Sequence, residues 1–114
     1  MNIEAFITKL NSTPDAIQFG DTIAIIDAYY EFTPSAFQNG ALKNEAGQNS
    51  GSCKLFSFAK LQGLNETQTL ACFGDYYRVD VLPHPDAQDH QNIRNFIQFG
   101  WSGIAFENDA LRKK

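Results

Sequence analysis

The 114-residue chain is long enough to fold as one domain around its own core, and ten Phe residues supply much of the apolar surface. Its net charge is −4, and outside the basic tail 112–114 only six Lys and Arg residues face thirteen Asp and Glu. This acidic balance disfavours nucleic acid and anionic membranes as partners, and no apolar run approaches the roughly 20 residues of a membrane-spanning helix.

The N-terminal part of the chain is predicted to hold two helices. Residues 3–10 place apolar side chains at the i, i+3, i+4 and i+7 positions of one helix face. Asp21 is a good N-cap for a second helix that runs to about Tyr30, and its nearly continuous apolar sequence predicts a central, buried helix. The Thr33-Pro34 step ends it, because a residue that precedes proline avoids the helical region.

The rest of the chain is predicted to form three more helices and a small β-ribbon. Residues 35–44, around the hairpin dipeptide Asn39-Gly40, and residues 101–106 are the candidate ribbon segments. The helices span residues 53–62, 65–77 and 86–99, with Ser52, Asn65 and either Asp86 or Asp89 as their caps. The fold class is therefore mainly α: a single domain over residues 1–114, with about five short helices and a tail, 108–114, that we expect to be frayed.

Both cysteines, Cys53 and Cys72, lie among apolar residues in the predicted helices. This usage is typical of reduced, buried thiols and predicts a cytoplasmic protein. Cys53 also stands at a helix start, a position that favours a reactive thiolate. The alternative for Cys53 is therefore a nucleophile that His84 or His90 would activate.

The stretch Gly47–Lys54 runs from a loop into a helix and is the candidate binding segment. A helix N-terminus offers free N–H groups and the positive end of the helix dipole, so an anionic group of a ligand could dock there. Gly51 would allow close approach, and Lys54 would add a positive charge. The alternative is an ordinary capped helix start, since the spacing is not that of a P-loop.

His90 and Arg94 are i, i+4 neighbours and project from one face of the last predicted helix. One hypothesis is that both face solvent. The other is that they line a pocket for an acidic small molecule together with three residues of the candidate binding segment, namely Asn49, Cys53 and Lys54.

A metal-binding site is the third kind of site to consider from the sequence. Residues 84–90 hold two His and two Asp, but their spacing matches none of the familiar zinc or calcium loops. We therefore expect no metal and no cofactor.

Three long strings of the sequence carry a family resemblance: AGQNSGSCKLFSFA (46–59), QTLACFGDYY (68–77) and HPDAQDHQNIRNFIQFGWSGIAF (84–106). They resemble the HopJ family of bacterial type III effector proteins, and the resemblance extends from about Ile3 to Phe106. It implies delivery into a host cell by a type III secretion system, a role in virulence, and action by binding a host or bacterial protein. It assigns no catalytic or ligand-binding residue.

Two other functions remain open beside the effector hypothesis. One is a small cytoplasmic enzyme or ligand-binding domain with an anion-accepting pocket, and the other is a folded module with a purely bacterial partner. Residues 3–10, which would carry an export signal, are predicted to belong to the fold, so that only unfolding would present them to an export machine.

Overall fold

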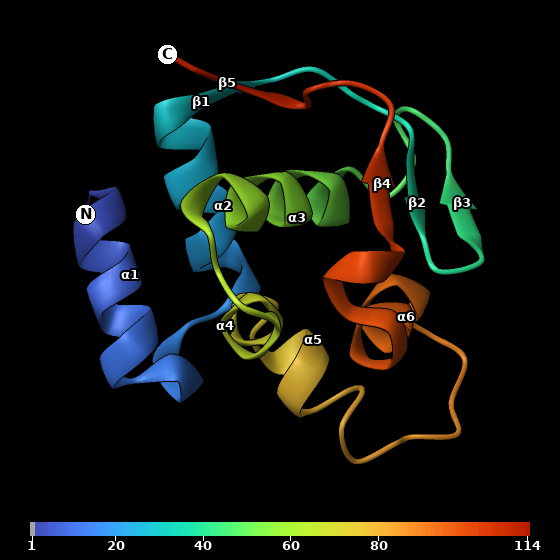
Figure 1. Cartoon of the computed structure of the whole chain (residues 1–114). Helices are drawn as coiled ribbons and strands as arrows, with labels where there is room; N and C mark the ends of the chain where they lie inside the picture. The colour runs from blue at the N-terminus through green and yellow to red at the C-terminus, as the bar shows by residue number, and fades with distance from the viewer. Residues whose placement is uncertain (1) are drawn as a thin grey trace.

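In the computed structural model, which describes residues 2–114, the chain folds into a mainly helical domain with two small antiparallel sheets (Figure 1). Within these residues the α-helices are α1 (Ile3–Ser12), α2 (Phe19–Tyr29), α3 (Ser50–Gln62), α4 (Glu66–Ala71), α5 (Asp75–Arg78) and α6 (Gln91–Phe99). The strands are β1 (Tyr30–Phe32), β2 (Phe37–Asn39), β3 (Leu42–Asn44), β4 (Ile104–Phe106) and β5 (Leu111–Lys113). Short 3₁₀ helices, η1 (Pro14–Ala16) and η2 (Gly100–Gly103), follow α1 and α6. The predicted fold class is confirmed.

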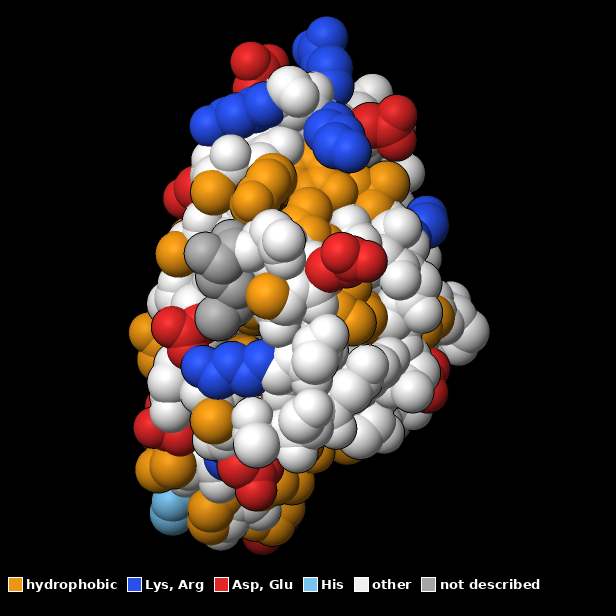
Figure 2. All heavy atoms as spheres, turned by 90° about the vertical axis from the view of Figure 1, so that its left-hand side faces the viewer, with side chains coloured by type: hydrophobic (Ala, Val, Ile, Leu, Met, Phe, Trp, Pro, Cys, Tyr) orange, Lys and Arg blue, Asp and Glu red, His pale blue; other side chains and the backbone are white. Residues whose placement is uncertain are grey.

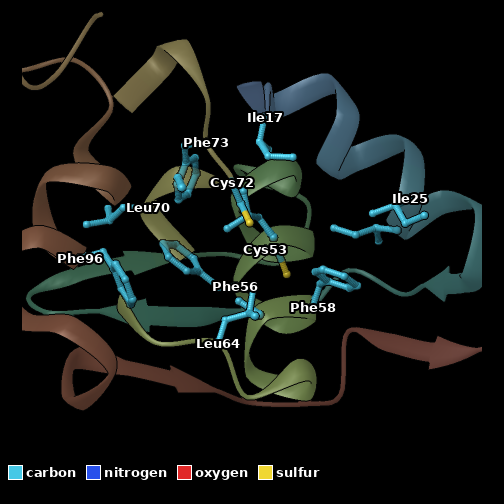
Figure 3. Packing of buried hydrophobic residues seen from close by; sticks show 14 of the residues in the cluster. Ile17, Ile25, Cys53, Phe56, Phe58, Leu64, Leu70, Cys72, Phe73 and Phe96 are labelled. Carbon is cyan, nitrogen blue, oxygen red and sulfur yellow. The ribbon is translucent and has the colours of Figure 1, made fainter. Parts of the chain in front are cut away.

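The helix at the centre of the core is α3, whereas the sequence predicts that residues 21–30 are central. Helix α2 buries only one face and exposes Ala24 and Ala28. Phe56 of α3 contacts the rings of Phe73 and Phe96 (Figure 3). Burial of a Phe side chain contributes about 1.5–3 kcal/mol, so the rings around α3 hold the helices and the sheet together.

The predicted β-ribbon is confirmed as a three-stranded sheet with the order β3-β2-β4. Phe37 of β2 pairs with Asn44 of β3 on one side and with Phe106 of β4 on the other. The turn between β2 and β3 contains Gly40 at φ 63°, whose N–H donates to the carbonyl of Gly103 at 2.9 Å. The dipeptide Asn39-Gly40 therefore marks a hairpin, as its composition indicates.

The prediction of a frayed tail is wrong, because residues 111–113 form β5 and pair with β1. Ala110 and Leu111 are only 2% and 7% exposed, and Lys114 Nζ donates to the carbonyl of Asp27 at 2.8 Å. Burial of Leu111 and pairing with a strand far away in the chain fix this segment. A local sequence pattern contains no information on such a distant partner.

The helix predicted over residues 65–77 is divided into α4 and α5 at Gly74, which has φ 62°. A Cβ atom at this position would lie 2.7 Å from the backbone of Gln18, so the close approach requires glycine. The side chain of Gln18 accepts a hydrogen bond from the N–H of Asp75 at 3.1 Å. Helix α5 is thereby attached to the start of α2.

Charged side chains are distributed unevenly over the surface. Figure 2 shows several Lys and Arg side chains at the end of the molecule where β1 and β5 lie, and further basic atoms lower on the same face among acidic, hydrophobic and other groups. This face therefore presents no continuous basic surface. None of the helices within residues 2–114 has the length and hydropathy needed to cross a membrane.

Candidate functional site

A cleft of about 470 Å³ opens between the N-termini of α3 and α6, and we call it the α3–α6 cleft. Its size lies in the range of small-molecule sites, about 300–1,000 Å³. Its polar side is formed by the first residues of the two helices, namely Asn49, Gly51, Ser52, His90, Gln91 and Asn92. The sequence singles out two segments, residues 47–54 and 84–94, and residues of both segments line this one cleft.

Both helices that open into the cleft lack a side-chain cap within residues 2–114. Their N-cap residues are Asn49 and His90, each at φ 51°, and no other non-glycine residue among those described has a positive φ. By contrast, the side chain of Asn65 accepts a hydrogen bond from the first turn of α4. The predicted caps Ser52, Asp86 and Asp89 are wrong. Among the described residues, the N–H groups of residues 50–52 in α3 and 91–92 in α6 have no acceptor, whereas the N–H of Ile93 donates to the carbonyl of His90 at 3.0 Å.

The side chains of these N-cap residues are occupied elsewhere, and that of Asn49 joins a network of buried asparagines. Asn44 Oδ1 accepts hydrogen bonds from Asn49 Nδ2 at 2.7 Å and from Asn92 Nδ2 at 3.0 Å. Asn92 Oδ1 in turn accepts from Asn44 Nδ2 at 3.2 Å and from Asn39 Nδ2 at 3.0 Å. Asn39 and Asn44 are fully buried and Asn92 is 6% exposed, so this asparagine network fixes both helix starts to the β2–β3 hairpin.

The side chain of His90 is held by an acid and by an aromatic ring. His90 Nε2 lies 3.1 Å from Asp80 Oδ2, and the imidazole stacks on the ring of Tyr76 with centroids 5.2 Å apart. The contact with the Asp80 carboxylate thus fixes the orientation of the imidazole ring, as in the acid–histidine pairs of many sites.

Arg94, a predicted ligand-binding residue, instead stabilises the loop that precedes α6. Its guanidinium donates to the carbonyl of His84 at 2.7 Å and to Asp89 Oδ1 at 2.7 Å. The hydrogen bond from Arg94 is the main reason why the pKa of the Asp89 carboxyl lies below its ordinary value. Arg94 therefore positions the loop that ends at His90 rather than lining the cleft.

Aromatic side chains form the apolar wall of the cleft. The ring of Phe19 lies 6.1 Å from that of Phe73 with nearly parallel planes, and 5.2 Å from that of Tyr76. Tyr76 contacts His90, so four rings follow one another along the cleft. Tyr76 is 45% exposed, which leaves part of its ring free for a ligand to contact.

The hypothesis that all five predicted residues converge is wrong, since only Asn49 and His90 line the cleft. Cys53 is 2% exposed and lies in the apolar core (Figure 3), where burial raises the pKa of its thiol. Lys54 Nζ pairs with Asp27 Oδ1 at 2.8 Å. Cys53 is therefore no activated nucleophile, and the charge of Lys54 is already matched.

Several residues that line the cleft were not among the predicted site residues, chiefly Phe19, Tyr76, Gln91 and the buried Asn92. The buried Asn44, which holds Asn49 and Asn92 from behind the lining, was not predicted either. Asn44 and Asn92 are polar residues in an otherwise apolar environment. Such residues are a signal of a buried network, but their separation in the chain conceals that they meet. Aromatic residues such as Phe19 are indistinguishable from core residues in the sequence alone.

The described residues, 2–114, contain no cluster of three or more His, Cys, Asp or Glu side chains that could hold a metal ion. The groups that line the cleft are the imidazole of His90, three side-chain amides, the hydroxyls of Ser52 and Tyr76, and aromatic and aliphatic side chains. The arrangement can therefore bind an uncharged or weakly anionic group through hydrogen bonds and contact a flat apolar group through the wall.

Comparisons with known proteins identify one family and one structural relative. The family model described as "HopJ type III effector protein" matches residues 3–111. The crystal structure of the protein of unknown function VPA0580 is 52% identical in sequence and superposes with a TM-score of 0.98 over 100% of this chain and 95% of that chain. No curated protein matches the chain.

Proposed function

The chain belongs to the HopJ type III effector protein family, and we propose that it acts as a binding protein that takes a small polar ligand in the α3–α6 cleft. The observation that carries this proposal is a cleft of about 470 Å³ that is lined both by uncapped helix starts and by aromatic side chains. A mainly apolar lining with a few polar groups is the usual composition of a small-molecule site.

The rigidity of the polar side supports binding. The asparagine network fixes the starts of α3 and α6 in a conformation that costs about 1–3 kcal/mol for each non-glycine residue with positive φ. Strain of this kind persists where surrounding contacts determine it, and it clusters at ligand sites. Because the donors are already oriented, a ligand loses little free energy in ordering them.

NMR spectroscopy of the ¹⁵N-labelled chain tests the proposal with a fragment mixture of aromatic acids, nucleobases and sugars. We expect saturable shifts at the amides of Gly51, Ser52, Gln91 and Asn92. Ser52→Phe fills the cleft and abolishes these shifts, whereas Ser12→Phe, at the exposed end of α1, leaves them unchanged. If no fragment moves these amides, or if Ser52→Phe leaves the shifts intact, the proposal fails.

A second candidate function is that of an exported effector that binds a protein in the host cell. The observation that favours it is the family match over residues 3–111. The burial of α1 constrains how the chain could be exported, because Phe6 and Leu10 of this helix are only 0% and 2% exposed. An export signal in these residues would become accessible only on unfolding.

Export is tested with a reporter enzyme fused to the C-terminus, in a bacterium with an intact type III system and in an isogenic strain that lacks it. The effector function requires reporter activity in host cells from the first strain alone. Absence of export under secreting conditions refutes it and leaves the ligand-binding proposal untouched, since that proposal concerns the cleft in the folded chain.

A further inference from the structure

The α3–α6 cleft presents hydrogen-bond acceptors as well as donors. The amide of Asn49 donates through Nδ2 to Asn44 at 2.7 Å, and the amide of Gln91 donates through Nε2 to the carbonyl of Gln88 at 2.7 Å. These contacts fix which end of each amide is engaged. Asn49 Oδ1 and Gln91 Oε1 accept no hydrogen bond from residues 2–114, and they remain for the N–H of a ligand.

The same helix starts also carry hydrogen-bond donors. The first-turn N–H groups of α3 and α6 have no side-chain cap within the described residues, and they follow Asn49 and His90 directly in the chain. A ligand edge that offers a carbonyl beside an N–H would match this alternation of donor and acceptor. Such an edge is found in lactam groups, where O=C and N–H are adjacent.

The wall of the cleft favours a flat ligand. Phe19, Phe73, Tyr76 and His90 line it with their rings in sequence, and Tyr76 is 45% exposed. Stacking of a flat base on an aromatic side chain contributes about 1–3 kcal/mol to binding, with little dependence on which base it is. A sugar would gain less from four flat rings, because its own faces are not flat.

The charge of the lining separates neutral from phosphorylated ligands. No Lys or Arg lines the cleft, Lys54 is paired with Asp27, and Arg94 is engaged by the loop that precedes α6. A phosphate dianion would find helix dipoles and the imidazole of His90, which already contacts the Asp80 carboxylate, but no Lys or Arg side chain to balance its charge. In a chain with a net charge of −4, this disfavours phosphate as the recognised group.

From these observations, and on the basis of the proposed function, we infer that the ligand of the α3–α6 cleft is a neutral, flat nitrogen heterocycle with a lactam edge, of the kind present in oxo-substituted nucleobases. Its ring lies against Tyr76 and Phe19, its carbonyl accepts from the first turn of α3 or α6, and its N–H donates to Asn49 Oδ1 or Gln91 Oε1.

Calorimetry and NMR titration with hypoxanthine and uracil test the ligand class. Purine lacks the carbonyl and 1,3-dimethyluracil lacks the N–H groups, so we expect each to bind at least about tenfold more weakly than its parent, the equivalent of about 1.4 kcal/mol. Benzoate and glucose serve as an aromatic acid and a sugar. Inosine 5′-monophosphate carries the hypoxanthine ring with a phosphate, and we expect no tighter binding than for hypoxanthine.

Variants of the wall separate stacking from folding. Tyr76→Ala lowers affinity for hypoxanthine about tenfold or more, Tyr76→Phe retains it, and Val79→Ala serves as a control, because Val79 is 55% exposed and outside the cleft. The spectra of the free variants show whether each remains folded. Since Tyr76 is half exposed, we expect all three to fold.

The outcomes distinguish this inference from the proposed function. Shifts of the cleft amides with benzoate or glucose, but not with hypoxanthine or uracil, overturn the lactam class and leave a ligand-binding cleft. Much tighter binding of inosine 5′-monophosphate than of hypoxanthine overturns the preference for a neutral ligand. If no probe moves the cleft amides, both the ligand class and the proposed function fail.

Discussion

Substitution of Asn44 by alanine should destabilise the protein because Asn44 is the centre of the asparagine network. Its side chain is fully buried. It donates to the carbonyl of Phe37 at 3.4 Å and to Asn92 Oδ1 at 3.2 Å, and accepts from Asn92 at 3.0 Å and from Asn49 at 2.7 Å. Asn44→Ala removes these four contacts at once.

The magnitude follows from the geometry. A hydrogen bond contributes about 1 kcal/mol net, and a buried group left without a partner costs about 1–3 kcal/mol. The two shorter contacts count fully and the two longer ones less, while the amide of Asn92 loses partners in a site that is 6% exposed. We therefore expect the free energy of unfolding to fall by about 3 kcal/mol, or roughly 100-fold in the folding equilibrium.

Urea unfolding monitored by circular dichroism measures this change, and the midpoint of thermal unfolding should fall by roughly 10–15 °C. Asn108→Ala is the matched control, because Asn108 is exposed and its side chain takes no part in the network. We expect the control to change stability by less than about 0.5 kcal/mol. An equally small loss in Asn44→Ala would refute the view that the network fixes the two helix starts.

Three further predictions concern other contacts. Gly74→Ala should lower the free energy of unfolding in urea by about 1–3 kcal/mol, because Gly74 has φ 62° and a Cβ atom there would lie 2.7 Å from neighbouring backbone. Gly20→Ala in α2 has open space around it and should raise the free energy of unfolding by up to about 1 kcal/mol; equal effects of the two substitutions would contradict the steric argument. Burial raises the pKa of Cys72 from an ordinary 9.0 to about 12, so the buried neutral thiol contributes at most about 4 kcal/mol to stability below pH 9, and this contribution is lost as the pH rises toward 12. The free energy of unfolding of Cys72→Ala should therefore fall less steeply between pH 9 and 12 than that of the unsubstituted protein, and an equally steep fall would count against Cys72 as the cause. The pKa of Asp89 is lowered mainly by the hydrogen bond from Arg94, so the stabilisation from this contact is present above the ordinary pKa of 3.8 and is lost as the pH falls through the lowered pKa. In an NMR titration of Arg94→Gln, the pKa of the Asp89 carboxyl should rise toward its ordinary value, and an unchanged pKa would exclude Arg94 as the cause.

Local patterns in the sequence predict much of the fold, because most helices here depend on residues close to them in the chain. The capping pair Asn65 and Gln68 marks the start of α4, and the Asn39-Gly40 dipeptide marks the hairpin of the three-stranded sheet. Contacts between distant residues were not predictable in this way. The pairing of Tyr30 with Lys113 fixes a tail that looks polar and unrestrained in sequence.

The candidate site was predicted in part. Helix-start composition pointed to residues 47–54 and 84–94, which do meet at one cleft. The direction of individual side chains was not predictable, because Lys54 and Arg94 turn to Asp27 and to the loop before α6. Whether a long basic side chain faces a cleft or a neighbouring carboxylate depends on tertiary packing, and no local pattern records it.

The rules for helix starts fail at both helices that open into the cleft, and also at α2, where Gln18 and not the predicted Asp21 is the N-cap. Ser52 and Asp89 are better caps than Asn49 and His90 in their observed conformation, and a conventional cap would stabilise each helix by about 1 kcal/mol. Both helices instead begin at a residue with φ 51° whose side chain is bonded elsewhere. Departures from local preference are expected where function opposes stability. At α2 the capping box of Gln18 and Asp21 still engages the helix start, whereas the starts of α3 and α6 have no side-chain cap among the described residues and both line one cleft, so a ligand that supplies acceptors there would account for this difference.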